Sequence, residues 1–225
     1  MRDGPNITNI AALVGDHARA EVLTALMSGM ALTATELADA AGVTRQTISS
    51  HLAKLQDAGL LAVATQGRHR YFRIADAEVA GMLETLMGVA FGTGSVRVRS
   101  SPREPALRKA RVCYDHMAGE LGVLVYESLA RHGALALDAD GVALTPGGAA
   151  LLGRIGIGVA GLPPSRRPFC RTCLDWSERR THLAGTLGTL MLARFETLGW
   201  ARRIPGSRVL AFNPAGEAAL RAWLD

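Results

Sequence analysis

Residues 116–122 and 182–188 carry nearly the same letters, and this repeat constrains the fold of the second half of the chain more than any other feature. The first copy reads HMAGELG and the second reads HLAGTLG, 66 positions later. Each copy is followed by a hairpin pattern and then by a Pro-x-Gly step of the kind that opens a helix. We therefore expect an internal duplication of one helix–hairpin–helix unit, over about residues 113–155 and 179–224.

Small residues follow each repeated histidine and indicate close packing. An Ala-Gly pair follows the histidine in both copies, and a further glycine follows three residues after the pair. The residues are Ala118, Gly119 and Gly122 in the first copy and Ala184, Gly185 and Gly188 in the second. A glycine inside a helix costs about 1 kcal/mol relative to alanine, so a close approach of two backbones must offset that cost. We expect the first copy to lie in a long helix over about 104–131 and the second in a matching helix. If the two helices cross about a twofold axis, His116 and His182 face one shared cavity.

The three cysteines lie near these histidines in the sequence. Cys113 would share a helix face with His116, and Cys170 and Cys173 would lie in the loop before the second helix. Thiolate and imidazole ligands suit zinc, copper or a thiophilic metalloid. We predict a metal site whose ligands are Cys113, His116, Cys170, Cys173 and His182.

Three alternatives to a metal effector site remain open. A cysteine near a helix N-terminus has a lowered pKa, which suits a thiol redox switch; here Asp175 and Glu178 would cap that helix. A small-molecule effector would need a pocket, and the side chains placed to line it are His116, Trp176, Arg179 and His182. The cysteines and histidines would otherwise be structural, either as core residues or as a structural zinc site.

A different pattern occupies the first ninety residues. Helical periodicity and capping residues predict helices that begin after Asp16, after Thr33 or Thr35, and after Thr44. A β-hairpin with a basic tip follows, and then a further helix from Asp76. Two helices joined by a short turn that contains glycine form a helix-turn-helix, and the hairpin after them is its wing.

The stretch TELADAAGVTRQTISSHLAKLQDAGLLAVATQGRHRYFRI resembles the ArsR/SmtB family of bacterial winged-helix transcriptional repressors. The resemblance covers about residues 10–90, with the recognition helix, the Gly-Leu exit and the Gly-Arg wing in the family's order. It implies a homodimer, paired mainly through the first helix and the helix after the wing. It also implies binding to an inverted repeat in double-stranded DNA, with release when an effector arrives.

The chain departs from the resemblance where metal-sensing members hold their ions. Such members often carry cysteines in the helix before the recognition helix, or Asp and His at both ends of the helix after the wing. Here the first segment is ELADAAGV, without cysteine, and residues 76–90 contain no histidine. Any sensing is therefore expected in the second half.

The predicted DNA surface combines short hydrogen-bonding groups with long cations. Such groups read base edges in the major groove and hold phosphates. Residues 44–73 carry five positive side chains against one negative, within a segment, 1–91, whose charges sum to −2. The residues predicted to contact DNA are Thr44, Arg45, Gln46, Thr47, Ser49, Ser50, His51, Lys54, Arg68, His69 and Arg70.

Length and composition predict a mainly α, α+β protein of two domains. We expect a winged helix-turn-helix domain over 1–91, a linker over 92–105 and an effector domain over 106–225, the latter resembling degenerate winged helices. The start, MRDGPNITNI, lacks the pattern of a signal peptide, and no apolar run approaches the roughly 18 residues of a membrane span. We expect a cytoplasmic protein without a membrane partner.

Together these features predict a DNA-binding regulator, a repressor released from its operator by an effector in the second domain, with a metal or metalloid ion favoured. It is not expected to be an enzyme. The rival hypotheses are a metal- or thiol-dependent enzyme with an appended winged helix, and a regulator whose Cys/His cluster is only structural.

Overall fold

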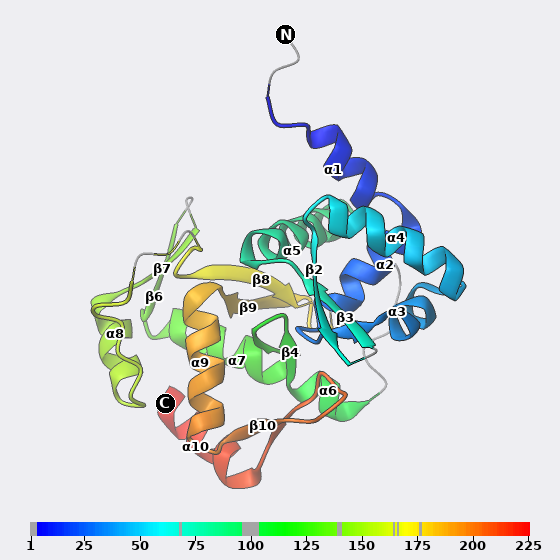
Figure 1. Cartoon of the computed structure of the whole chain (residues 1–225). Helices are drawn as coiled ribbons and strands as arrows, with labels where there is room; N and C mark the ends of the chain where they lie inside the picture. Colours follow the sequence, from blue (N-terminus) through cyan, green and yellow to red (C-terminus); the bar gives the residue numbers. More distant parts are fainter. Residues whose placement is uncertain are drawn as a thin grey trace. The chain divides into compact units, whose positions relative to one another are not determined.

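The computed structural model describes residues 4–67, 69–95, 104–138, 141–163, 165, 167–175 and 177–225 (Figure 1). Internal contacts divide the chain into two compact units, Met1–Leu83 and Glu84–Asp225. The division falls inside helix α5 (Ala77–Gly92), before the boundary predicted at residue 91. Most of the predicted linker, 96–103, lies outside the described residues.

The first unit is a winged helix-turn-helix. Its three strands form one antiparallel sheet in the order β1-β3-β2. The elements are α1 (Ile7–Val14), α2 (His17–Leu26), β1 (Leu32–Thr33), α3 (Ala34–Ala41), α4 (Arg45–Asp57), β2 (Leu61–Gln66) and β3 (His69–Ile74).

Three helices of the first unit begin where the capping residues predict, while α1, capped by Asn6, is additional to the predicted helices. Asp16, Thr33 and Thr44 cap α2, α3 and α4 by accepting a hydrogen bond from a backbone N–H three residues on. Thr33 forms a full capping box with Glu36. Gly42 has a φ of 66°, the left-handed conformation that allows the tight turn from α3 into α4. The winged helix predicted from the sequence is thereby confirmed.

The second unit contains two copies of one hairpin–helix–hairpin–helix module, drawn in green to yellow-green and in yellow to red in Figure 1. A short helix, α6 (Pro105–Lys109), precedes them. The first copy consists of β4 (Arg111–Cys113), β5 (His116–Ala118), α7 (Glu120–Arg131), β6 (Leu135–Asp138), β7 (Gly141–Leu144) and α8 (Pro146–Gly153). The second consists of β8 (Arg171–Asp175), β9 (Arg180–Ala184), α9 (Gly185–Thr197), β10 (Ala201–Arg203), β11 (Leu210–Phe212) and α10 (Pro214–Leu224).

The duplication is confirmed, but each module starts one hairpin earlier than the sequence predicts. The long helix expected over 104–131 is wrong, since the chain forms α6, then the β4–β5 hairpin, and only then α7. HMAGELG and HLAGTLG are each a strand end followed by a helix start. The strands have only three to five residues, too short for period-two alternation to reveal them in the sequence.

The two copies share one hydrophobic core and exchange contacts. Helix α7 packs on β9 of the other copy, and α9 packs on β5. The core includes Leu121 and Leu129 from α7 and Leu187, Leu192 and Phe195 from α9, all nearly inaccessible to solvent. Because each helix lies on the other copy's hairpin, strand β5 of the first copy contacts strand β9 of the second.

A search of the described residues for membrane-spanning segments finds no helix that combines the length and the apolar character required.

Candidate metal centre and nucleic-acid interface

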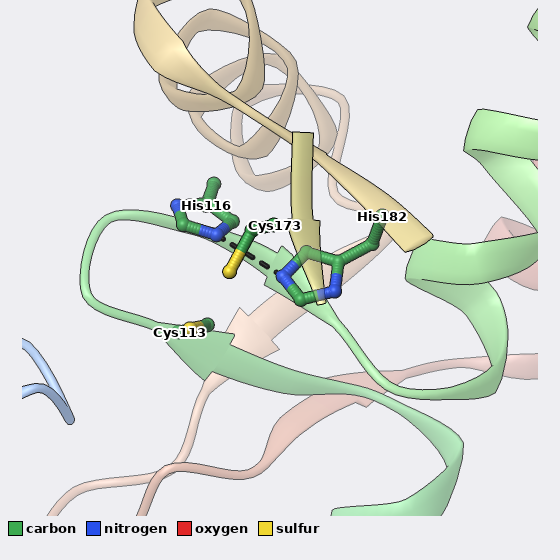
Figure 2. A group of neighbouring side chains, drawn as sticks. All are labelled: Cys113, His116, Cys173 and His182. Atoms are coloured by element: carbon green, nitrogen blue, oxygen red, sulfur yellow. Dashed lines mark hydrogen bonds between the residues drawn. The ribbon is translucent and has the colours of Figure 1, made fainter. Parts of the chain in front are cut away.

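Four side chains from the two central hairpins converge on one point in the second unit (Figure 2). Cys113 and His116 are cross-strand partners in the β4–β5 hairpin, and Cys173 and His182 are cross-strand partners in the β8–β9 hairpin. One ligand atom from each of the four lies within 4.8 Å of all the others. Each copy therefore supplies one cysteine from its first strand and one histidine from its second.

The turns of the two hairpins hold the backbone in an unusual conformation. Tyr114, between Cys113 and His116, has a φ of 56°, and Arg179, shortly before β9, has a φ of 55°. Among the described residues other than glycine, these two have a positive φ. Such a conformation costs a non-glycine residue about 1–2 kcal/mol. Local strain of this kind gathers at functional sites, where the surrounding structure maintains it.

Glycines allow the two copies to approach each other at the histidines. A Cβ atom on Gly188 would lie 3.0 Å from the His116 Cβ and 2.8 Å from the Leu183 carbonyl oxygen. In the other copy, a Cβ on Gly122 would lie 2.6 Å from the Met117 carbonyl oxygen. The predicted role of these glycines in close packing is correct. The packing partner, however, is a histidine on a strand and not a second crossing helix.

The two histidines are in direct contact at the centre of the site. Their Nε2 atoms lie 3.1 Å apart, and both side chains are essentially inaccessible to solvent. In a hydrogen bond between the two Nε2 atoms, one ring donates its N–H and the other ring accepts with its lone pair. If the proton between the two rings were lost, both Nε2 atoms would have a free lone pair directed at the same point, where one cation could bind.

A carboxylate lies at the outer nitrogen of each ring. Asp115 Oδ1 is 3.3 Å from His116 Nδ1, and Asp175 Oδ2 is 3.5 Å from His182 Nδ1. In metal sites a carboxylate at this position fixes the ring and leaves Nε2 as the ligand atom. The expectation that Asp175 caps a helix is wrong, because Asp175 ends β8 and pairs with Arg180 in the β8–β9 hairpin.

Each carboxylate near the histidines is paired with an arginine. Asp175 accepts from Arg111 at 2.5 Å, although both are almost fully buried, and it also accepts from the Gly119 N–H at 2.6 Å. Burial alone would raise the pKa of Asp175, but Arg111 and the backbone donors lower it overall. Asp115 accepts from both guanidinium nitrogens of Arg167, one of them at 2.8 Å. Arg167 lowers the pKa of Asp115 despite its burial.

The protons of the cluster are shared between its members. The thiol of Cys173 donates to Cys113, which lowers the pKa of Cys113 and raises that of Cys173. Burial disfavours the charged form of His116, but the Cys113 thiolate and Asp115 outweigh it and raise the His116 pKa to about 9. The lowered pKa of the Cys113 thiol suits a soft-metal site, in which the thiolate is the ligand.

The donor set fits a tetrahedral metal ion. Two thiolates and two imidazoles form a Cys₂His₂ set, and bonds of about 2.3 Å to sulfur and 2.0–2.1 Å to nitrogen put tetrahedral ligand atoms roughly 3.3–3.8 Å apart. The observed spread of 4.8 Å requires only a small contraction. With four protein ligands and no open position, such a site is closed, whereas catalytic zinc sites keep one position for water or substrate.

Cys170 lies outside this cluster, contrary to the prediction. It stands just before β8 and packs, half-buried, against the hydrophobic core. Burial raises the pKa of its thiol. The predicted small-molecule pocket also gains no support: Arg179 is exposed at a hairpin turn while the two histidines are buried, and Trp176 lies outside the described residues.

The predicted DNA surface lies on α4 and the wing of the first unit. Ile48, Leu52 and Leu55 of α4 are buried, which turns the polar face outward. The predicted DNA-contacting residues that are exposed are Thr44, Arg45, Gln46, Thr47, Ser49, Ser50, Lys54, His69 and Arg70. Arg68 lies outside the described residues.

His51 is placed differently from the rest of this surface. Its side chain is only 15% exposed, and its Nδ1 lies 3.6 Å from Asp16 and 3.5 Å from Arg19. It therefore links α4 to α2. At the other end of α4, Arg70 donates to Gln56 at 3.1 Å, which connects the wing to the recognition helix.

The chain is similar to known transcriptional regulators. The family model described as a helix-turn-helix domain matches residues 14–64. The chain is 38% identical over 221 residues to the HTH-type transcriptional regulator YdfF of Bacillus subtilis, and the match covers 98% of both chains. The chain belongs to the HTH-type transcriptional regulators. Its first unit is a winged helix-turn-helix, the fold that the resemblance of its sequence to the ArsR/SmtB family predicts.

Other members are similar to the first part of this regulator. The HTH-type transcriptional regulator CmtR of Mycobacterium tuberculosis is 30% identical over 83 residues, 37% of this chain and 70% of CmtR. The solved structure of CmtR, described as a cadmium metal-sensor, covers 44% of this chain and 94% of its own at 26% identity, with a TM-score of 0.33. A homodimeric winged helix-turn-helix fragment from Mycobacterium bovis covers 40% and 91% at 22% identity, with a TM-score of 0.36.

Proposed function

We propose that this transcriptional regulator is a metal-responsive repressor. The winged helix binds operator DNA, and a divalent ion held by Cys113, His116, Cys173 and His182 shifts the protein away from its DNA-binding state. The observation that carries the proposal is the convergence of these four ligand atoms within 4.8 Å. An ion needs only to bind the second state better by a few kcal/mol to produce such a shift.

The charges around the cluster favour a divalent ion. The three nearest carboxylates, Asp115, Asp175 and Glu84, are each paired with an arginine, so these pairs are neutral overall. Two thiolates then leave two negative charges in a buried site, where an unbalanced charge is costly. Zn²⁺ or Cd²⁺ balances the two thiolates by itself, and the Cys₂His₂ set is one that Zn²⁺ takes. Cu⁺ would balance one thiolate and leave the other to Arg208, a largely buried cation that interacts with Cys113. Of the zinc, copper and metalloid ions expected from the sequence, we therefore favour the divalent ones.

Apolar side chains on the surface support a homodimer. Large apolar side chains are exposed on α1, at Ile7, and on α5, at Leu86, Met87 and Val89. Helix α5 is the helix after the wing, one of the two that pair in the ArsR/SmtB dimer according to the resemblance stated above. The other, the first helix predicted from the sequence, is α2, and α1 precedes it. Two identical recognition helices would then read an inverted repeat.

The similarity to CmtR supports regulation by metal only in a general way. CmtR is described as a cadmium sensor. Its similarity covers 83 residues, 37% of this chain, so the proposed site is argued from the residues of this chain alone. The closed ligand set also favours a regulatory or structural ion over the rival hypothesis of an enzyme.

The test combines metal analysis with DNA binding by the full-length protein. Operator DNA is selected from a random duplex library with metal-free protein, and its Kd is measured by fluorescence anisotropy with and without Zn²⁺. We expect one zinc ion per chain and an operator Kd raised about tenfold or more by zinc. Cys113→Ser and His182→Ala should abolish both effects, and Cys170→Ser, the matched control, should leave both unchanged.

Two results would overturn the proposal. In the first, zinc binds at these residues and operator affinity stays the same, while removal of the ion unfolds the second unit; the site would then be structural. In the second, Cys170→Ser abolishes zinc binding and Cys113→Ser does not, which would place the site elsewhere.

A further inference from the structure

Two adjacent residues of α5 contact both cysteine–histidine hairpins. Glu84 Oε2 lies 3.3 Å from Arg171 Nη1, and its Oε1 lies 4.0 Å from His116 Nδ1. The next residue, Thr85, accepts a hydrogen bond from the guanidinium of Arg171 through its hydroxyl. Arg171 is the first residue of β8, the strand that carries Cys173, and His116 belongs to β5. One helix is thus attached to one hairpin from each copy.

The Glu84 carboxylate is in a costly environment. Its side chain is only 5% exposed, and Oε1 has no hydrogen-bond donor among the described residues. Burial raises the pKa of this carboxyl. A buried acceptor without a donor is destabilising. Here the second oxygen faces the outer nitrogen of a proposed metal ligand.

Helix α5 begins in the first unit and ends in the second. The first turns of α5 belong to the winged-helix unit, and the second unit begins at Glu84. The same helix carries the exposed apolar residues Leu86, Met87 and Val89. A displacement of Glu84 and Thr85 is therefore a displacement of the helix that leads directly out of the DNA-binding unit.

We propose that Glu84 and Thr85 couple the metal cluster to DNA binding by anchoring α5 to both hairpins. This inference rests on the proposed function. Ion binding contracts the ligand atoms from a spread of 4.8 Å to about 3.3–3.8 Å. The contraction draws His116 and the start of β8 together, and through Glu84 and Arg171 it moves α5. Glu84 is a positioning residue in this scheme and not a ligand.

The experiment compares Glu84→Gln with the wild type and with Glu78→Gln, a control on an exposed position of the same helix. Zinc affinity and the operator Kd with and without Zn²⁺ are measured for each full-length protein. We expect Glu84→Gln to bind zinc within a few-fold of the wild type while its ratio of operator Kd values falls from about tenfold to near one. Glu78→Gln should keep the wild-type ratio.

Thr85→Val provides a second, milder variant in case Glu84→Gln does not fold. It should lower the ratio part of the way, because one of the two contacts with Arg171 is lost. If wild-type protein responds to zinc and both variants respond equally, the coupling role is refuted while the metal-responsive function stands. If wild-type operator affinity ignores zinc, the proposed function fails, and this inference fails with it.

Discussion

The two units of this regulator present their chemistry in opposite ways. In the first unit the predicted DNA-contacting residues that the structure describes are exposed, apart from His51, and lie within one stretch of the chain, from Thr44 to Arg70. In the second unit the four cluster residues are largely or wholly buried and come from two hairpins about sixty residues apart. A surface that reads DNA must be accessible, whereas an ion site of soft ligands is strengthened by exclusion of water. This difference predicts that substitutions in the first unit weaken DNA binding, whereas substitutions in the second unit lower the stability of the fold.

The largest effect is expected from removing a buried charge in the second unit. Arg111→Ala leaves the carboxylate of Asp175 buried and unpaired, and loss of one partner from such a pair costs about 3–5 kcal/mol. Hydrogen exchange of the full-length protein should show faster exchange across residues 104–225 and unchanged protection in 4–67. Arg203→Ala, which removes an exposed pair with Glu196, is the control and should have little effect. Equal effects of the two variants would show that burial of the network is not what stabilises this unit.

A smaller effect on stability is expected at the contact between the two copies. The Cβ of Gly188→Ala would meet the His116 Cβ and the Leu183 carbonyl, so the strands must shift, at a cost of about 1–3 kcal/mol. Gly153→Ala, at the end of α8, meets no atom within 4 Å and should be neutral or slightly stabilising. Chemical denaturation of both variants measures the difference. Similar free energies of unfolding would contradict the close approach of the two copies at the histidines.

The smallest effect on folding, and a clear effect on binding, is expected in the first unit. Arg45 is exposed at the start of α4, so Arg45→Ala should leave stability within about 0.5 kcal/mol of the wild type. Operator affinity should fall about tenfold, and the slope of log K against log salt should decrease in magnitude by about one. An unchanged salt slope together with unchanged affinity would move the DNA surface away from α4.

The same comparison explains what could be predicted from the sequence. The winged helix follows from local rules, since Thr33, Gly42 and Thr44 cap and turn helices whose apolar residues recur at helical spacing. The duplication and the meeting of His116 with His182 also follow from the repeat. The strands that carry these histidines do not, because three residues are too few to show alternation and the small residues beside them imitate a helix.

The outer residues of the metal site could not be predicted from the sequence. Asp175, Arg111 and Arg167 reach the cluster only through tertiary packing, and nothing in their spacing relates them to the histidines. The Cys-x-x-Cys spacing of Cys170 and Cys173 is typical of a pair of metal ligands, and the sequence therefore predicts both in the site. Cys170 stands just before β8 and packs against the hydrophobic core, so only Cys173 of this pair reaches the cluster.

The claim that both copies jointly hold one ion is tested most directly by X-ray absorption of the zinc-loaded, full-length protein. We predict two sulfur neighbours at about 2.3 Å and two nitrogen neighbours at about 2.0–2.1 Å. In Cys173→Ser one sulfur should be lost, and in Cys170→Ser the spectrum should be unchanged. A shell of three sulfurs, or one dominated by oxygen in the wild type, would contradict the Cys113, His116, Cys173 and His182 site.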